Sequence, residues 1–424
     1  MTRLHFAQVQ HPVGQGGFHT GWLFDPAIPM QLGPNIQGRI GFAWAYDCGS
    51  DQLSALHSQI QNVGGAAFKV LFLSHLDDDH VVGVDRLLTA SRVDEVVLPY
   101  LGDDEWALHL AASASAGSLS GTFIELAGDP AGWFGARGVQ RITYIETHED
   151  DDDAPDGPDP VDPSDLDPDH RRKIDDGAED APELIKLGWS RPPQPWQQSL
   201  TDNASTEIVV VSRGAVAVLH TPGRTLNWVL SPFAFRPSAA KMLKFEAKLA
   251  TKFGAGLTAK QYADAARTPQ GRIDLRECYD AVWTTHNLHS MALYAGPAVS
   301  ILNKVHNTVW HGKFTHRIVQ PGWISTGDFD ATVKKRRQAL LRYYARYAHT
   351  VGQITLPHHG SDLSFDASIL QAFPDLSFAI AAVGNNGHGH PGKGVQAAVA
   401  SIPAVGFVRV DEGPSSFYEI VGPV

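Results

Sequence analysis

The sequence predicts an α/β protein in which sheets and helices form layers. Short apolar runs typical of buried strands recur along the chain, and in its C-terminal half they alternate with amphipathic helical patterns. Many of these apolar runs end in polar residues, as strands do where a sheet meets its loops. With 424 residues, 43% of them hydrophobic, the chain is long enough to bury a large core.

The individual elements follow from these patterns in chain order. We expect strands at residues 44–50, 68–75, 95–101, 206–212, 215–220, 290–296, 322–328, 352–359, 376–383, 406–412 and 417–422. We expect helices at residues 50–64, 81–91, 240–254, 334–349 and 392–402. Residues 257–283 have the pattern of a helical insert rather than of core sheet.

One segment, residues 149–180, differs from the rest of the chain in charge. It holds fifteen acidic and three basic side chains, which accounts for the whole net charge of −12 and leaves the remainder neutral. The segment is rich in Asp and Pro and almost free of apolar residues, so we expect a flexible surface loop. An acidic decoy or a cation-attracting segment is the alternative. The rest of the chain is neutral overall, so it lacks the excess of Lys and Arg that is typical of general nucleic-acid binding. A local basic groove is still compatible with this overall charge.

Cysteine content and the N-terminal sequence limit the kind of metal site and the expected location of the protein. Cys48 and Cys278 are too few for a disulfide framework or a thiolate zinc cluster, so any metal must be bound by His and carboxylate. No run of 18 apolar residues is present, and the stretch MTRLHFAQVQHPVG lacks the apolar core of a secretory signal. We therefore expect a cytoplasmic protein without a membrane span.

The stretch LSHLDDDHVVG (73–83) concentrates ligand chemistry at the end of an expected strand. His75, Asp77, Asp79 and His80 lie within six positions, and alternate residues of a short loop can converge on one point. A divalent ion needs such dense imidazole and carboxylate donors, because each donor replaces a water of hydration. The alternative is an acidic turn that caps the next helix.

Further residues of the same chemical types follow other expected strands. They are Asp47 after residues 44–46, Asp328 in GWISTGDFD (322–330), His358 and His359 in GQITLPHHGS (352–361), and His388 and His390 in AAVGNNGHGHPGKG (381–394). A single carboxylate after a strand is usually a cap or a turn. Several such strand ends are explained more simply by convergence on one site, because ligands of α/β folds gather at strand ends.

These residues resemble a known family. HLDDDH resembles the HxHxDH signature of the metallo-β-lactamase fold, with Asp77 where the second His usually stands. More narrowly, the chain is similar to the soluble ComEC-like competence hydrolase domain and to the phosphorylcholine esterases. The motifs that carry the narrower resemblance are VGQGG (13–17), TGDFD (326–330), PHHGS (357–361), GHGHPG (387–392) and VDEGP (410–414).

The resemblance implies an αββα sandwich with a two-metal site between its sheets. Because the motifs lie near both ends of the chain, it implies one domain over residues 1–424. The distance from His80 to Ser290 is long for the fold, so we expect an insertion at residues 140–285. This insertion would contain the acidic loop and several helices.

The resemblance also implies a role for each site residue. His75 and Asp77 would bind the first metal, Asp79, His80 and His359 the second, and Asp328 would bridge the two. His358 would face the substrate, and His390 is a second candidate for contact with a developing oxyanion. Asp79 or Asp328 would orient the attacking hydroxide, and Asp47 would buttress a ligand His. Cys48 is expected to be a small buried residue.

Two departures from the family pattern bear on the metals. Asp77 replaces an imidazole with a carboxylate, which favours manganese relative to an all-His site, although zinc stays an alternative. The third His ligand of the family pattern has two candidates, His286 and His289, which stand near the right position. Alternatively, no His takes this place, because Asn287 and Ser290 match the Asn-x-x-Ser pattern of the ComEC-like group.

The predicted function is that of a dinuclear metal-dependent hydrolase, with a phosphodiesterase or nuclease favoured. Its partner would be a phosphodiester-containing substrate, and two zinc or manganese ions its cofactor. Two ions lower the pKa of a bridging water and stabilise charge on a phosphate oxygen. One alternative is hydrolysis of a lactone, thioester or β-lactam, which would need an aromatic-lined pocket, although Trp283 and Trp323 are expected to be buried core. The other is a non-catalytic protein that binds metal or a partner.

Overall fold

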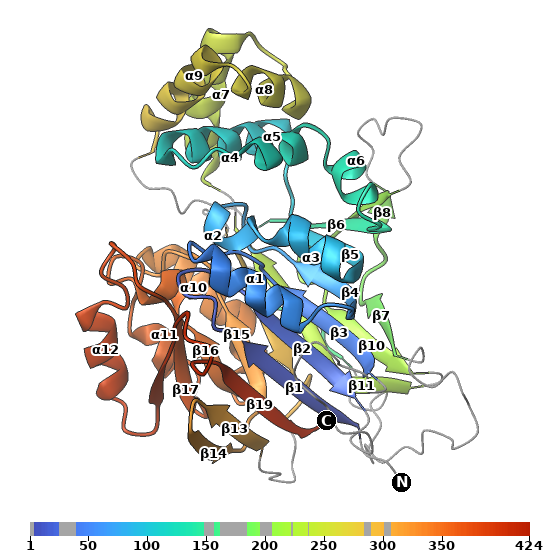
Figure 1. Ribbon diagram of the computed structural model, residues 1–424, viewed down its shortest axis with the longest axis vertical. Coiled ribbons are helices and arrows are strands. Elements are labelled where there is room, and N and C mark those ends of the chain that lie inside the picture. Colours follow the sequence, from blue (N-terminus) through green and yellow to red (C-terminus); the bar gives the residue numbers. More distant parts are fainter. Residues whose placement is uncertain are drawn as a thin grey trace.

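The computed structural model describes residues 4–24, 40–147, 157–161, 185–195, 206–221, 224–235, 237–283, 290–300 and 307–424. Within these residues the chain forms two mixed sheets and a set of helices (Figure 1). The predicted α/β class is therefore confirmed. Most of the expected acidic loop, residues 149–180, lies outside the described residues.

The first sheet combines a parallel half with an antiparallel half. Its strand order is β14 (Phe314–Ile318), β13 (Asn307–His311), β19 (Tyr418–Pro423), β1 (His5–Gln10), β2 (His19–Phe24), β3 (Ile40–Tyr46), β4 (Ala67–Phe72), β5 (Arg92–Pro99), β6 (Arg141–Ile145), β9 (Glu207–Val211) and β8 (Gln194–Pro195). Strands β3, β4, β5, β6 and β9 run parallel. The other pairs are antiparallel.

The second sheet has the same mixed character. Its strand order is β18 (Gly406–Val410), β17 (Phe378–Ala382), β16 (Val351–Thr355), β15 (Gly322–Ser325), β12 (Met291–Gly296), β11 (Arg224–Ala234), β10 (Ala217–Thr221) and β7 (Lys186–Trp189). Strands β15 to β18 run parallel, and the others pair antiparallel. The strands expected at 68–75, 322–328, 352–359 and 376–383 are thus observed as β4, β15, β16 and β17.

The two sheets pack face to face around a shared apolar core. Trp44 and Val70 of the first sheet belong to the same buried cluster as Trp228, Leu293 and Trp323 of the second. The parallel strands are apolar on both faces, because helices cover their outer sides. In β4, for example, Val70 faces the other sheet and its neighbour Leu71 faces the helices.

Helices cover the outer face of each sheet. On the first sheet lie α1 (Leu53–Asn62), α2 (Asp78–Val81) and α3 (Val84–Ala90), and on the second lie α10 (Lys334–Tyr343), α11 (Ser368–Gln371) and α12 (Lys393–Ala400). In α1, Leu56 and Ile60 are four residues apart and bury one stripe against the sheet. The order of layers is therefore helix, sheet, sheet, helix (Figure 1).

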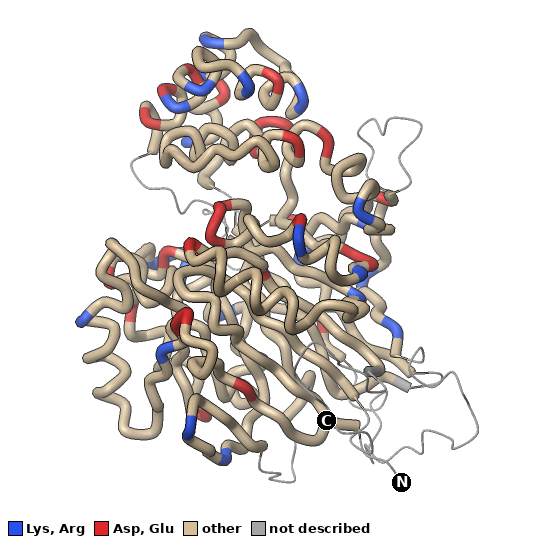
Figure 2. The backbone as a smooth tube through the Cα atoms, in the orientation of Figure 1, with Lys and Arg blue, Asp and Glu red and all other residues tan. Residues whose placement is uncertain are grey.

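A separate group of helices, which we call the helical lobe, stands beyond the ends of the strands (Figure 1). It comprises α4 (Asp103–Ala116), α5 (Gly121–Gly128), α7 (Ala239–Phe253), α8 (Ala259–Ala266) and α9 (Pro269–Asp280). The short helix α6 (Pro130–Gly135) follows α5. Figure 2 shows acidic positions on α2, between the sheets and the helical lobe.

Strands from the range 140–285, which the resemblance implies to be an insertion, belong to both sheets. Its strands β6, β8 and β9 belong to the first sheet, and β7, β10 and β11 belong to the second. Its helices α7, α8 and α9 pack with α4 and α5 in the helical lobe, and α4 and α5 precede the expected insertion. The strands of this range also contribute to the buried faces between the two sheets.

No helix in the described part of the chain is long and apolar enough to cross a lipid bilayer.

Candidate metal centre

Strand ends from both sheets bring the predicted ligands together. Asp47 follows β3 and residues 75–80 follow β4, which are neighbouring parallel strands of the first sheet. Asp328 follows β15, and His358 and His359 follow β16, which are neighbouring parallel strands of the second. Parallel neighbours end at the same edge of a sheet, so both sheets deliver these side chains to one region.

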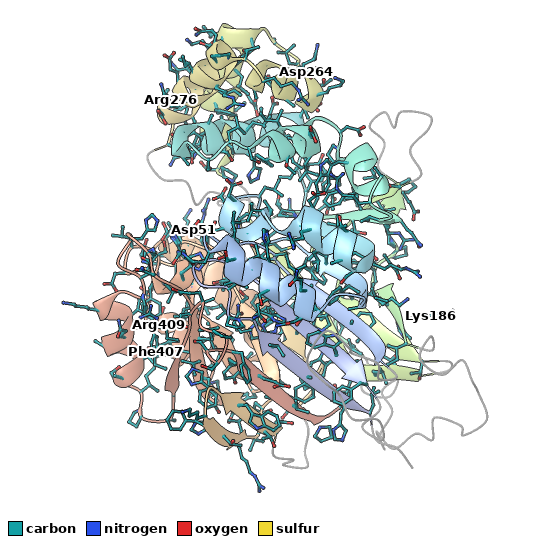
Figure 3. The ribbon with its side chains drawn as sticks, in the orientation of Figure 1. Asp51, Lys186, Asp264, Arg276, Phe407 and Arg409 are labelled. Carbon is teal, nitrogen blue, oxygen red and sulfur yellow. The ribbon has the colours of Figure 1, made fainter. Side chains whose placement is uncertain are left out.

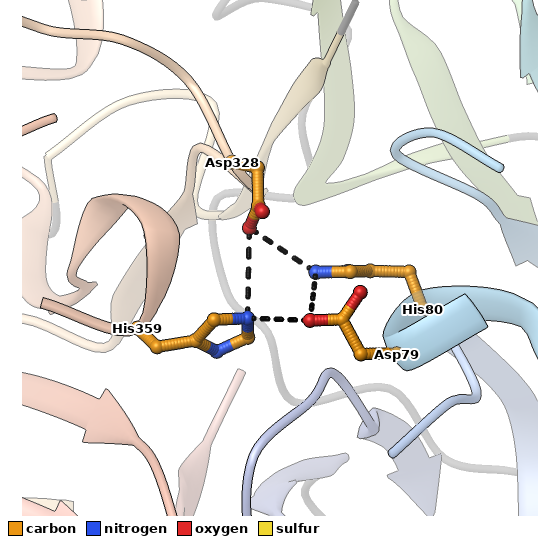
Figure 4. Close-up of side chains that lie close together, drawn as sticks. All are labelled: Asp79, His80, Asp328 and His359. Carbon is orange, nitrogen blue, oxygen red and sulfur yellow. Dashed lines mark hydrogen bonds and ion pairs between the residues drawn. The ribbon is translucent and has the colours of Figure 1, made fainter. Parts of the chain in front are cut away.

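Four of these side chains, Asp79, His80, Asp328 and His359, form a compact cluster (Figure 4). One ligand atom of each lies within 4.8 Å of the others. His80 Nε2 is 3.1 Å from Asp328 Oδ1 and 3.9 Å from Asp79 Oδ2. His359 Nε2 is 3.1 Å from the same oxygen of Asp79 and 3.7 Å from Asp328 Oδ1. Two imidazole nitrogens and two carboxylate oxygens therefore surround one point.

The outward nitrogens of both cluster imidazoles have fixed partners. His80 Nδ1 lies 2.8 Å from Asp47 Oδ2, and the Asp47 carboxylate also accepts from the N–H and the hydroxyl of Ser74 at 2.7 and 2.8 Å. His359 Nδ1 donates to the carbonyl of Ala382 at 2.9 Å. Metal-binding histidines usually donate their other N–H in this way, which fixes the ring and leaves Nε2 free to accept a cation. The predicted buttressing role of Asp47 fits this geometry.

The second oxygen of Asp328 faces another group of side chains. His358 Nε2 lies 3.5 Å and His75 Nε2 3.8 Å from Asp328 Oδ2, and His75 Nε2 is 3.7 Å from Asp77 Oδ2. His75 Nδ1 contacts the Ser74 hydroxyl at 2.8 Å, whereas its buried Nε2 has no hydrogen-bond partner among the residues that the structure describes. A buried polar atom without a partner is costly, by about 1–3 kcal/mol, and calls for an explanation.

Two consecutive histidines reach the centre from an unusual backbone. His358 and His359 lie in the 3-10 turn η3 (Pro357–Gly360), with φ of 46° and 56° in the left-handed region. Non-glycine residues there cost on the order of 1–2 kcal/mol each. The two imidazoles thereby face the two different oxygens of Asp328.

The charges in the cluster are strongly coupled. Burial alone would raise the pKa of Asp79, but the neighbouring His80 and the hydrogen bond from His359 outweigh it and lower the pKa to about 2. Burial likewise opposes protonation of His80 and His359, yet the adjacent carboxylates raise the pKa of both imidazoles. At Asp77, burial and the charges of Asp79 and Asp328 raise the pKa to about 8. Protons thus take the places that a cation would take, and metal binding would release them.

The donor set fits divalent ions. Bonds of about 2.1 Å in a tetrahedral site put neighbouring ligand atoms about 3.4 Å apart. Around Asp328 Oδ1 the separations given above run from 3.1 to 3.9 Å, as one such site requires, and Oδ2 lies 3.5 Å from His358 Nε2 and 3.8 Å from His75 Nε2. Imidazole and carboxylate together suit zinc or manganese. An ion would also supply the missing partner of His75 Nε2.

The glycine motif near the N-terminus packs directly against the centre. A Cβ atom on Gly17 would lie 3.0 Å from His80 Nδ1 and 3.0 Å from Asp47 Cβ. The Gly17 N–H donates to the carbonyl of Asp79 at 3.0 Å. The segment VGQGG (13–17) therefore needs glycine here because its backbone approaches the ligands too closely for a side chain.

A cleft of about 220 Å³ opens from the centre toward the helical lobe. Asp77, Asp79 and Asp328 line one side of it, and Ala112 and Ser113 of α4 line the other. Asp51, which also lines the cleft, lies at this end of the sheets in Figure 3. Among the described residues that line the cleft there is neither Lys nor Arg.

His390 borders the same cleft from the loop before α12. Its ring centroid is 5.2 Å from that of His358 and 5.8 Å from that of His388. Burial and the neighbouring His358 lower the pKa of His390 to about 4, so the imidazole is neutral at pH 7. A neutral imidazole at this place can donate an N–H to a ligand in the cleft.

The structure brings together the residues that the sequence singles out. His75, His80, His358 and His359 surround the Asp328 carboxylate, Asp77 and Asp79 lie against these imidazoles, and His390 lies beside His358. Cys48 is fully buried, as expected. Of the residues proposed for a third His or its replacement, His286, Asn287 and His289 lie outside the described residues, whereas Ser290 is described and contacts the Asp328 N–H.

Two serines support the site: Ser74 was not predicted from the sequence, whereas Ser290 was noted as part of the Asn-x-x-Ser pattern. Ser74 contacts both Asp47 and His75, and its position directly before the first His was the available signal. The Ser290 hydroxyl accepts the N–H of Asp328 at 3.1 Å and donates to the Thr326 carbonyl at 3.0 Å, which fixes the Asp328 loop. The small residues Ala112 and Ser113 of α4, which line the cleft, have no sequence feature that identifies them as site residues.

Neither protein-family models nor curated proteins match this chain.

Proposed function

We propose that the chain is a metal-dependent hydrolase with the metallo-β-lactamase fold, and that it cleaves phosphodiesters at a dinuclear centre. The observation that carries the proposal is the position of Asp328 between two sets of ligands. Its Oδ1 faces His80 and His359, and its Oδ2 faces His75 and His358. A carboxylate so placed suits the bridge between two cations.

The layered architecture supports the same family. Helices, two face-to-face sheets and further helices follow one another, as the αββα sandwich requires. The candidate ligands follow strands in the family's order, from His75 through Asp328 to His359. Fold alone does not determine chemistry, so the reaction is argued from the site.

The residues of the chain would divide the chemistry between them. Zinc or manganese ions would supply a water of lowered pKa and positive charge beside a phosphoryl oxygen. Asp79 borders both the cluster and the cleft, so its carboxylate can orient an attacking water by accepting a hydrogen bond. His390 is neutral at pH 7 and can donate to the oxygen on which charge develops. The family role of His358 would also be at the substrate.

The cleft favours a small substrate. A nucleic-acid backbone is normally tracked by Lys and Arg, and the described lining contains neither. A space of about 220 Å³ accommodates a single phosphodiester with modest substituents rather than a duplex. Trp283 and Trp323 are buried, with 3% and 0% exposure, and are not among the residues that line the cleft, so they supply no aromatic pocket for an apolar ester.

The test is hydrolysis of bis(p-nitrophenyl) phosphate by metal-stripped protein with added Mn²⁺ or Zn²⁺. We expect metal-dependent turnover that is abolished in the Asp79→Ala/His80→Ala double variant, with an unchanged circular dichroism spectrum. The matched control is His349→Ala/Asp375→Ala, which removes a surface His–Asp pair 3.1 Å apart. Turnover retained in the first variant would refute the site. If the protein binds metal but has no phosphodiesterase activity, lactone, thioester or β-lactam substrates become the proposal. If the protein binds no metal, a non-catalytic binding role becomes the proposal.

A further inference from the structure

The two oxygens of Asp328 divide the surrounding imidazoles into two pairs. Oδ1 has His80 at 3.1 Å and His359 at 3.7 Å. Oδ2 has His358 at 3.5 Å and His75 at 3.8 Å. In each case the contact is made by Nε2, so each oxygen faces two ring nitrogens.

Each pair also has one carboxylate of its own. Asp79 Oδ2 lies 3.1 Å from His359 Nε2 on the first side, and Asp77 Oδ2 lies 3.7 Å from His75 Nε2 on the second. Without His358, the Oδ2 side would have a single imidazole among the described residues. With it, the two sides have the same composition.

The conformation of His358 is suited to a fixed ligand. Its backbone N–H donates to the Gly327 carbonyl at 3.0 Å, one residue before Asp328. Its Nδ1 lies 3.0 Å from the Ser364 hydroxyl. The left-handed backbone at His358 and His359 lets consecutive imidazoles serve opposite oxygens of one carboxylate. This is the arrangement seen at His80 and His359, in which one ring nitrogen is held by the protein and the other faces the centre.

We propose that His358 is a ligand of the first metal ion, and that the centre consists of two matched sites. Each site has two imidazoles, one carboxylate of its own and one oxygen of Asp328. This inference rests on the proposed dinuclear function and changes the family-derived role of His358 from the substrate to the metal. An all-His first site would use two imidazoles besides His75. Asp77 and His358 together would take their places, so both ions would have the same donor types.

Matched sites have a measurable consequence. Three carboxylates, Asp77, Asp79 and Asp328, would face two divalent ions, and neither ion would have the more basic or the softer site. We expect the two binding constants for Mn²⁺ to lie within about tenfold of each other. A site that loses one of its four ligands should bind its ion more weakly by at least about tenfold, as loss of even an outer partner does.

The experiment measures bound metal rather than activity. Metal-stripped wild-type protein, His358→Ala and His358→Gln are titrated with Mn²⁺, dialysed, and analysed by inductively coupled plasma mass spectrometry. We expect two ions in the wild type and one tightly bound ion in both variants, with the second at least tenfold weaker. His390→Ala is the matched control, because His390 borders the same cleft but faces neither Asp328 oxygen among the described contacts. It should retain two ions.

The outcomes separate this inference from the proposed function. If circular dichroism shows that His358→Ala and His358→Gln are folded and both still bind two ions tightly, His358 is not a ligand. The proposed dinuclear hydrolase would be unaffected by that result. Loss of the second ion in His286→Ala, with retention in the His358 variants, would do the same. A wild type that binds no ion would overturn both.

Discussion

Asp47 Oδ2 lies 2.8 Å from His80 Nδ1, and both side chains are buried. This bond assigns the proton of His80 to Nδ1 and leaves Nε2 available to a cation. Asp47→Asn would place an amide N–H opposite Nδ1 and favour the other tautomer. We expect metal affinity to fall about 10–100-fold while the fold is retained, since Asn tolerates the left-handed backbone at this position.

The measurement for Asp47→Asn is competition for Mn²⁺ or Zn²⁺ with a fluorescent chelator. Asp94→Asn is the control, because Asp94 bonds Lys69 at 3.1 Å and has no contact with the centre among the described residues. An affinity equal to that of the wild type would show that the bond does not govern the tautomer.

The carboxylate of Asp77 is expected to set the preference between metals. Asp77→His would add a softer imidazole next to His75, whose Nε2 lies 3.7 Å from the Asp77 carboxylate. We expect the ratio of bound zinc to bound manganese to rise about tenfold when both ions are supplied equally. Mass spectrometry of the dialysed protein measures the ratio. The control is Asp78→His, one residue along the chain, which should leave it unchanged.

The wall of the cleft is expected to select substrates by size. Ala116 is exposed at the end of α4 and lines the cleft. Ala116→Trp should lower kcat/KM for bis(p-nitrophenyl) phosphate about tenfold more than for the smaller methyl p-nitrophenyl phosphate. Metal content should not change. Thr122→Trp, an exposed site on α5, is the control. Equal losses on both substrates would argue against α4 as the wall.

Glu419 should make stability depend on pH. Burial raises the pKa of this carboxyl to about 7, above the value of 4.5 for a free Glu, so the folded state binds the proton more tightly. The resulting stability is complete below pH 4.5 and is lost as pH rises through 7. At 1.36 kcal/mol per pH unit, the full effect is on the order of 3 kcal/mol.

The substitution Glu419→Gln should remove the loss of folding stability that the wild type shows as pH rises through 7. Urea unfolding at pH 5 and pH 8 is expected to show the variant close to wild type at pH 5 and more stable at pH 8. Glu125→Gln, on the exposed side of α5, is the control and should follow the wild type at both pH values. A variant that gains nothing at pH 8 would contradict the assignment.

The strands that carry ligands were predictable because their sequences are apolar and end in polar residues. β4, β15 and β16 belong to this class. β1 was not predicted, because Gln8 and Gln10 interrupt its apolar pattern although both are buried, and Gln8 Nε2 contacts the Ala295 carbonyl at 3.4 Å. α4 was not predicted either: it is buried continuously from Trp106 to Ser113, so it lacks the one-sided periodicity of a surface helix.

The residue types of the centre were predictable, but the oxygen of Asp328 that His358 faces was not. Imidazole and carboxylate at strand ends indicate a metal site from sequence alone. Which nitrogen of His358 faces which oxygen of Asp328 depends on the left-handed turn at η3, and two consecutive histidines do not by themselves specify such a turn. The cleft wall depends on Ala112 and Ser113, which have no chemical signature.

The placement of β19 between β1 and β13 has a consequence for biosynthesis. β1 is translated about 400 residues before β19, yet the two strands pair along their length, and the Val424 N–H donates to the Leu4 carbonyl at 2.9 Å. At 5–20 residues per second, β1 waits on the order of a minute for its neighbour. During that time its exposed edge can recruit other chains. Chaperone protection of nascent β1, and aggregation when β19 is deleted, are the corresponding expectations.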